Sequence, residues 1–147
     1  MSVHDKQIGG DHYRAEIQHW DFITDNGFSY LRGCATKYLA RYRKKNGLED
    51  LHKAEHYIEK LREGIRYGKW CPSQDPDDHK EGVATLTEFL AANNIPEIDH
   101  PPFWWVLYGT TVNELTAALT HIQVLIKNWH IEHSEPHPDH KTTRRKR

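Results

Sequence analysis

Residues 28–65 carry the pattern that most restricts how this chain can fold. The stretch reads FSYLRGCATKYLARYRKKNGLEDLHKAEHYIEKLREGI, and apolar residues recur at helical spacing on both sides of Lys45-Asn46-Gly47. One face of the first arm collects Tyr30, Leu31, Cys34, Ala35, Tyr38, Leu39 and Tyr42, and one edge of that face carries Arg32, Thr36 and Arg43. One face of the second arm collects Leu51, Ala54, Tyr57, Ile58, Leu61 and Ile65. The pattern predicts a helical hairpin, with arms at about 29–45 and 48–66 and a left-handed stop at Asn46-Gly47.

The other segments also read as helices. Residues 19–26 form a short helical pattern that Gly27 is placed to stop, and Ser29 suits the N-cap of the first arm. Capping-box spacing at Thr85–Glu88 and Thr111–Glu114 predicts helices that run to about Asn93 and Trp129. The apolar run at 103–108 fits a short helix slightly better than a buried strand. With no convincing sheet and no internal repeat, the expected fold class is all-α.

Composition divides the chain into four regions. We expect a helical-hairpin domain at 1–66, a linker at 67–82, a C-terminal helical region at 83–131 and a disordered tail at 132–147. The 20 basic and 21 acidic residues nearly balance, so nucleic acid is not an expected partner. Two cysteines form no framework, which is typical of free thiols in a reducing compartment. No apolar run is long enough to span a bilayer, so we expect no membrane partner and a cytoplasmic protein.

A cationic ridge runs along the first arm. Lys37, Arg41 and Lys44 fall at i, i+4 and i+7, and Arg43, Lys45 and Lys53 lie nearby. Cations one helical turn apart repel one another, so the ridge suits an anion such as phosphate, although a solvated helix face is the plain alternative. Asp50 falls inside the apolar stripe of the second arm, where an unpaired carboxylate would be costly. We therefore expect Asp50 to pair with Arg41 or Lys37 across the hairpin.

The upstream segment Gly9-Gly10-Asp11-His12-Tyr13 is a second candidate. The two glycines could let a loop close over phosphate through backbone N–H groups, and Asp11 and His12 could transfer or orient protons. A plain turn explains the same residues. The sequence contains no GxxxxGK[ST] motif, which excludes a P-loop kinase.

Acidic residues on the second arm raise the possibility of a Mg²⁺-dependent pyrophosphohydrolase. The carboxylates are Glu49, Asp50, Glu55, Glu59 and Glu63, and they contain no ExxE pair, so i,i+4 charge pairing accounts for them better. A metal site is not favoured at His130, His133, His137 and His140. The terminal RRKR is better explained as a solubilising or nonspecific anion-binding end than as a specific binding motif. We predict no metal-ligating residues.

GGDHY, NGFSYLRG and KYLARYRKKNGLEDLHKAEHYIEKL together resemble a family of small domains that is widespread in tailed phages. The family has no assigned function in general, and its members are often called nucleotide kinase; it includes the early nucleotide kinase of T-odd short-tailed coliphages. The resemblance covers about residues 7–65. Cys34 departs from the Asn that the family usually carries at this position.

This resemblance implies phosphoryl transfer to deoxynucleoside monophosphates, chiefly dTMP and dGMP, in the cytoplasm of an infected bacterial host. A nucleoside triphosphate would be the donor, and Mg²⁺ is a possible cofactor. His12, Asp11, Lys37 and Arg41 would be catalytic, and the substrate would be bound by Gly9, Gly10, Tyr13, Tyr38, Lys44, Asp50, Lys53 and Tyr57. Lys37, Arg41 and Lys44 would bind phosphate, Asp50 would orient them, and Tyr13 and Tyr38 would support the base.

Three other functions remain open at this stage. The chain could bind a nucleotide or nucleotide signal without turnover, hydrolyse nucleoside triphosphates with Mg²⁺, or bind nucleic acid. We also expect a homo-oligomer, because a two-helix hairpin alone makes a shallow site. The Trp-rich run at 103–108 could serve as core or as a subunit interface.

Overall fold

The computed structural model describes residues 3, 16–69, 76, 78 and 80–134 of the 147-residue chain. Its elements are α1 (His19–Asn26), α2 (Tyr30–Arg41), α3 (Leu48–Arg66), α4 (Leu86–Ala92), the 3₁₀ helix η3 (Glu97–Asp99), α5 (His100–Tyr108) and α6 (Val112–Glu132). No strand occurs in these described ranges, and the all-α prediction is confirmed. The GGDHY segment, half of the expected linker and residues 135–147 lie outside the described residues.

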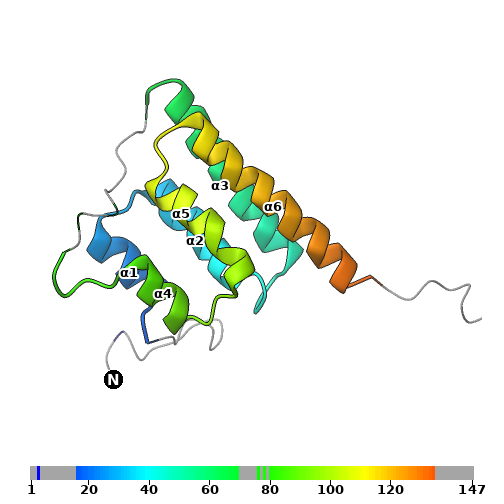
Figure 1. Ribbon diagram of the computed structural model, residues 1–147, viewed down its shortest axis with the longest axis horizontal. Coiled ribbons are helices and arrows are strands. Elements are labelled where there is room, and N and C mark those ends of the chain that lie inside the picture. The colour runs from blue at the N-terminus through cyan, green and yellow to red at the C-terminus, as the bar shows by residue number, and fades with distance from the viewer. Residues whose placement is uncertain (1–2, 4–15, 70–75, 77, 79, 135–147) are drawn as a thin grey trace, which may run out of the picture.

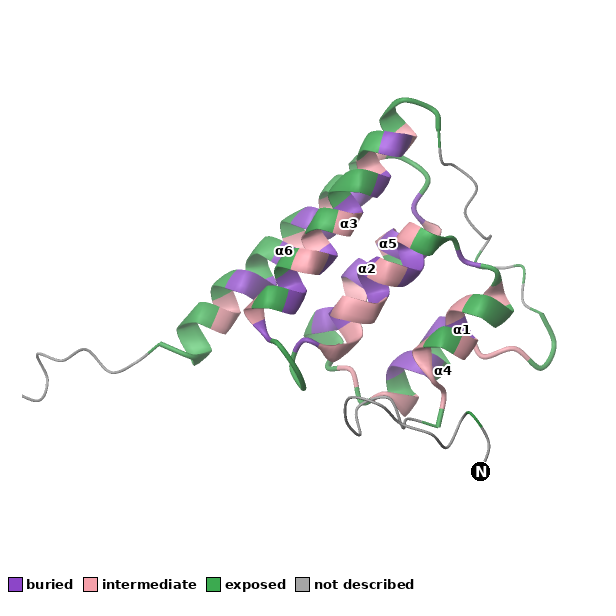
Figure 2. Cartoon of the chain, turned by 180° about the vertical axis from the view of Figure 1, so that it is seen from behind, coloured by how far each residue is buried: buried purple, intermediate pink, exposed green. Residues whose placement is uncertain are grey.

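The helices lie in three neighbouring pairs (Figure 1). The two longest, α3 and α6, run side by side, α2 and α5 form the middle pair, and α1 and α4 form the third. Buried residues face inward between the pairs, while the outer surfaces of α3 and α6 are largely exposed (Figure 2). None of the helices in the described part of the chain is long and apolar enough to cross a membrane.

The predicted hairpin is present as α2 and α3. Ala35 and Leu39 of α2 and Leu51, Ala54 and Ile58 of α3 are all almost completely buried. The first arm, however, ends at Arg41 rather than near residue 45. The helical i→i−4 pattern is lost there: Lys44 N–H donates to the Arg41 carbonyl, three residues earlier, at 2.9 Å, and Gly47 N–H donates to the Tyr42 carbonyl, five residues earlier, at 2.8 Å.

The segment after the linker packs on this hairpin. The capping boxes are confirmed: Thr85 accepts from Glu88 N–H at 3.1 Å, and Thr111 accepts from Glu114 N–H at 3.2 Å. The Trp-rich run is helix α5, and its Phe103, Val106 and Leu107 are fully buried. One continuous core joins residues of all six α-helices.

The pair formed by α1 and α4 is held together by aromatic packing. Phe22 of α1 stacks on Phe89 of α4 with ring centroids 4.5 Å apart and planes 10° apart. Gly27 ends α1 in a left-handed conformation with φ of 70°, as predicted. Gly33 of α2 lets α1 approach, because a Cβ there would lie 3.0 Å from Ile23 Cγ2. The small residue at position 33 thus accommodates another helix.

The edge of α2 with Arg32 and Thr36 is covered by other elements. Arg32 is only 1% exposed, and its guanidinium donates to the carbonyls of Val106 at 2.7 Å and Gly109 at 2.9 Å, at the end of α5. Conversely, Tyr30, which the helical pattern places on the apolar face, is 75% exposed. The buried face of α2 is therefore rotated from the predicted one, toward the Arg32 edge and away from Tyr30, because α5 supplies acceptors for Arg32.

Candidate functional site

The ring of Tyr38 is surrounded by cations on the surface of the hairpin. The charged groups of Arg41, Lys53 and Lys37 lie 4.6, 5.3 and 5.7 Å from the ring centroid. Tyr57 stacks beside the same ring, with centroids 5.8 Å apart and planes 10° apart. We call Lys37, Tyr38, Arg41, Lys53 and Tyr57 the Tyr38 face.

Helical spacing on two antiparallel arms builds this face. Tyr38 and Arg41 are three residues apart on α2, and Lys53 and Tyr57 are four apart on α3, so each pair projects from one side of its helix. A cation over an aromatic ring is attracted by the negative charge of the ring face. Gathering three cations around one partly exposed ring leaves a positive, aromatic patch, in which Arg41 pairs with Asp50 and Lys53 pairs with Glu49.

Asp50 holds Arg41 in this arrangement. The Asp50 side chain is fully buried, and its Oδ2 lies 3.3 Å from Arg41 Nε. Arg41 also donates from NH2 to Asp50 Oδ1 at 3.3 Å, and the backbone N–H of Asn46 donates to Oδ2 at 3.3 Å. The predicted pairing with Arg41 is therefore present. The same carboxylate ties Arg41 to the turn between the arms, which restricts where the guanidinium can move.

Lys37, which lies over the Tyr38 ring, also acts electrostatically on His19 of α1. The pKa of His19 is lowered from 6.5 to about 3, chiefly by burial and further by the charge of Lys37. The Thr36 hydroxyl donates to the Arg32 carbonyl at 2.9 Å, so His19 Nε2 carries the proton and donates to Thr36 Oγ1 at 2.8 Å. Because its pKa is lowered, His19 is neutral near pH 7 and the positive charge is on Lys37. Sequence reasoning missed His19, since a lone His in a short helix carries no distinguishing signal.

Lys44 departs from the predicted ridge. Because α2 ends at Arg41, Lys44 lies in the turn, and its ammonium donates to the Asn93 carbonyl at 3.4 Å, at the end of α4. Arg43 turns to η3, where it makes a two-point ion pair with Asp99 at 2.7 and 3.0 Å, which raises the pKa of Arg43. Of the ridge cations, only Lys37 and Arg41 reach the Tyr38 face, where Lys53 joins them.

Two further carboxylates of α3, Glu49 and Glu55, are engaged by neighbouring side chains. Lys53 pairs with Glu49 at 3.2 Å in the expected i,i+4 manner, and Glu55 accepts from Gln123 of α6 and lies 3.5 Å from His52 Nδ1. Within the described ranges, no three His, Cys, Asp or Glu side chains converge in the manner of a metal site.

The aromatic surface continues beyond Tyr57 toward the start of α2. Hydrogen bonding to the Cys34 side chain, with a further contribution from Tyr57, raises the pKa of the exposed Tyr30 hydroxyl. Tyr30 was not among the predicted site residues. Its spacing of four residues from Cys34 and eight from Tyr38 is the signal that could have identified it.

A family comparison covers this part of the chain. Residues 9–59 match DUF3310, a family described as a protein of unknown function. No curated protein and no solved structure matches the chain.

Every candidate site residue from Gly9 to Tyr57 lies within the DUF3310 segment. The predicted Gly9, Gly10, Asp11, His12 and Tyr13 lie outside the described residues, so their positions relative to the Tyr38 face stay predictions. The segment ends within α3, and α5 and α6, which cover the buried side of the hairpin, follow it in the chain.

Proposed function

We propose that this protein binds a nucleoside phosphate at the Tyr38 face and transfers a phosphoryl group to deoxynucleoside monophosphates. The observation that carries the proposal is the cluster of three cations around one partly exposed aromatic ring. Among the described residues, the ammonium of Lys37 has no carboxylate partner. The patch therefore keeps positive charge available for an anion.

The chemistry of the patch matches a nucleotide in two respects. Phosphate oxygens accept from both the point charge of a lysine and the forked donors of an arginine. Tyr57 and the exposed Tyr30 offer aromatic surface on which a base can stack, whereas the Tyr38 ring is already engaged by Arg41. We therefore place the phosphates at Lys37, Arg41 and Lys53, and the base toward Tyr57 and Tyr30.

Phosphoryl transfer mainly requires that the reacting groups are positioned and that the charge on the phosphates is neutralised, and fixed cations supply both. Asp50 contributes positioning, because it holds the Arg41 guanidinium before a ligand arrives. Asp11 and His12 are the proposed proton-handling residues, on the basis of the sequence resemblance. A nucleoside triphosphate is the proposed donor, and Mg²⁺ would bridge its phosphates if the reaction uses the metal.

Binding and turnover can be tested together. The protein is incubated with a panel of deoxynucleoside monophosphates and a triphosphate donor, with and without Mg²⁺, and the products are resolved by chromatography. Calorimetry then compares Lys37→Gln and Arg41→Gln with Lys69→Gln, a matched change at an exposed lysine beyond α3. Losing one charge-assisted contact should weaken binding about 10-fold to 100-fold, while Lys69→Gln should leave it unchanged.

The outcomes separate the alternatives. Equal binding by wild type, Lys37→Gln and Arg41→Gln would contradict the site. Binding without any diphosphate product would favour a sequestering protein. Pyrophosphate release from deoxynucleoside triphosphates would instead indicate a pyrophosphohydrolase.

A further inference from the structure

The Tyr38 face is the middle of a longer strip that runs along both arms of the hairpin. On α2 the side chains of the strip are spaced by four, three and four residues, so they share one side of the helix: Tyr30, Cys34, Lys37 and Arg41. On α3 they are spaced by four residues: Tyr57, Lys53 and Glu49. Because the two arms are antiparallel, aromatic residues gather at one end of the strip, cations lie in the middle, and Glu49 lies at the end nearest the turn.

Two carboxylates limit the positive charge of this strip. Asp50 is fully buried and pairs with Arg41 at 3.3 Å, whereas Glu49 has a 64% exposed side chain and lies 3.2 Å from the Lys53 ammonium. Among the described residues of the strip, three cations therefore face two carboxylates, which leaves one positive charge in excess. A phosphate monoester carries about 1.5 to 2 negative charges at neutral pH, and every further phosphate group adds more. The charge of the strip is thus closer to that of a monophosphate than to that of a triphosphate.

The order of the groups along the strip sets the direction of a bound phosphate chain. Tyr30 and Lys37 are seven residues, or two helical turns, apart, which is about 10 Å along the helix axis. A base at the aromatic end therefore places the first phosphate at Lys37 and Lys53. Further phosphates would continue toward the turn, where Glu49 lies and where the charge of Arg41 is already offset by its buried partner.

Glu49 is close enough to repel a phosphate that is bound at Lys53. A phosphate oxygen that accepts from the Lys53 ammonium lies about 3 Å from Nζ. Glu49 Oε1 is 3.2 Å from the same Nζ, so the two anions are within about 6 Å of each other. This separation is shorter than the Debye length of about 8 Å at physiological ionic strength, so salt does not remove the repulsion. The repulsion grows with the number of charges in the phosphate chain.

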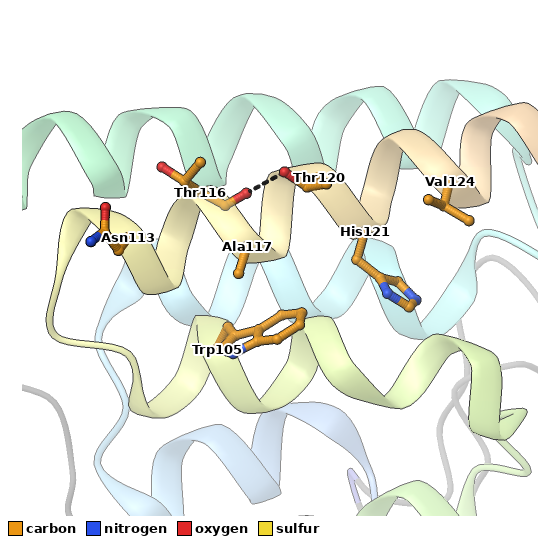
Figure 3. Close-up of a pocket in the computed structure, with 7 residues that line it drawn as sticks. All are labelled: Trp105, Asn113, Thr116, Ala117, Thr120, His121 and Val124. Carbon is orange, nitrogen blue, oxygen red and sulfur yellow. Dashed lines mark hydrogen bonds between the residues drawn. The ribbon is translucent and has the colours of Figure 1, made fainter.

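The groove between α5 and α6 offers nothing comparable to a phosphate. It has a volume of about 480 Å³, and the Trp105 ring faces Ala117 across it (Figure 3). No Lys or Arg is among the residues that line this groove. The charge argument therefore concerns the Tyr38 face and not the groove.

We propose that Glu49 restricts the Tyr38 face to nucleoside monophosphates, which makes this face the acceptor site, and that the triphosphate donor binds outside it. This inference rests on the nucleoside phosphate binding proposed above and adds which of the two substrates the face holds. The diphosphate product carries one more phosphate group than the acceptor, so the same repulsion from Glu49 favours release of the product.

Calorimetry on the full chain, in magnesium-free buffer with a chelator, compares dTMP with dTTP and dGMP with dGTP. Wild type should bind the monophosphate at least as tightly as the triphosphate. Glu49→Gln should tighten monophosphate binding about threefold and triphosphate binding at least about tenfold, because each phosphate charge near position 49 is relieved of one repulsion. At about 1 M salt, where the Debye length is about 3 Å, this difference should largely disappear.

Glu59→Gln is the matched control. It removes the same charge from an exposed position of α3, but position 59 lies about 120° around the helix axis from Lys53. This variant should leave the affinities for both nucleotides unchanged. Glu49 also lies in the first turn of α3, where a negative charge stabilises a helix. Loss of that contribution alone would not change the preference between monophosphate and triphosphate.

The outcomes separate this inference from the proposed function. Tighter binding of triphosphate than of monophosphate by wild type would overturn the acceptor assignment. So would a Glu49→Gln variant that tightens both nucleotides equally or neither of them. In each of these cases, conversion of a monophosphate to its diphosphate by a triphosphate donor would leave the proposed function standing. If neither wild type nor Glu49→Gln binds any of the four nucleotides, the proposed function and this inference are both overturned.

Discussion

At the scale of single residues, buried polar groups determine how the DUF3310 segment is oriented. Arg32 and Thr36 belong to an edge that helical periodicity alone leaves without partners, yet both are buried. Arg32 bonds the carbonyls at the end of α5, where the helix leaves acceptors unsatisfied. Burial of an arginine is tolerable only with such partners, so position 32 depends on a segment more than 70 residues away in the chain.

His19 makes stability depend on pH. Its pKa is near 3 in the folded protein and 6.5 is its ordinary value, so the unfolded chain binds the extra proton between these values. The contribution of His19 to the free energy of unfolding is therefore complete above about pH 6.5. It is lost as the pH falls toward 3, by up to about 1.4 kcal/mol per pH unit. His19→Gln keeps a donor toward Thr36 but does not titrate. Urea unfolding from pH 7 to pH 4 should show a smaller loss of unfolding free energy in this variant, and parallel losses would contradict the assignment.

At the scale of elements, the turn between α2 and α3 is shaped by Gly47. Its φ is +55°, and a Cβ at this position would lie 2.4 Å from Trp129 Cζ2 on α6. The ring of Trp129 also packs edge-on against Tyr42, with centroids 5.8 Å apart. The turn is thus in contact with α6, and its geometry and the packing of α6 depend on each other.

Substitution of this glycine should cost more than backbone strain alone. Gly47→Ala must adopt a positive φ and displace the Trp129 ring, so we expect a loss of about 2–4 kcal/mol in unfolding free energy. Gly68→Ala is the matched control, because Gly68 has φ of +69° and nothing within 4 Å of its Cβ position. That variant should lose only about 1 kcal/mol. Equal losses in chemical denaturation would show that the Trp129 contact contributes nothing.

At the scale of the whole molecule, the hairpin shares its core with the helices that follow. Leu51, Ile58 and Leu61 of α3 belong to the same buried cluster as Leu115 and Ile122 of α6. The expected division into a 1–66 domain and an 83–131 region thus separates helices that bury one another. Apolar surface left uncovered on the hairpin would remove much of the driving force for folding.

A truncation tests how far folding of the hairpin depends on the helices that pack on it. A fragment of residues 1–66 should show no cooperative thermal unfolding and should bind a hydrophobic dye. A chain that ends at residue 134 retains every described helix and should unfold cooperatively. Circular dichroism monitors the unfolding. A cooperative transition of the 1–66 fragment would show instead that the hairpin folds by itself.

Much of the local structure followed from the sequence, because it depends on near neighbours in the chain. Helical periodicity located both arms, Gly27 stopped α1 as expected, and the capping boxes at Thr85 and Thr111 began α4 and α6. The pairing of Asp50 with Arg41 was also predictable, since a carboxylate inside an apolar stripe needs a cation across a short turn. These features rest on interactions within about one hairpin.

The contacts between distant segments were decided only by the tertiary structure. Periodicity extended α2 to residue 45 and kept Lys44 on the ridge. In the structure, turn hydrogen bonds replace the helical pattern after Arg41, and Lys44 reaches the Asn93 carbonyl. Tyr30 lies exposed and Arg32 buried because α5 offers carbonyls to the arginine. A helical wheel shows which residues share a face. It cannot show which face a distant helix will cover, since that depends on donors and acceptors brought together only by folding.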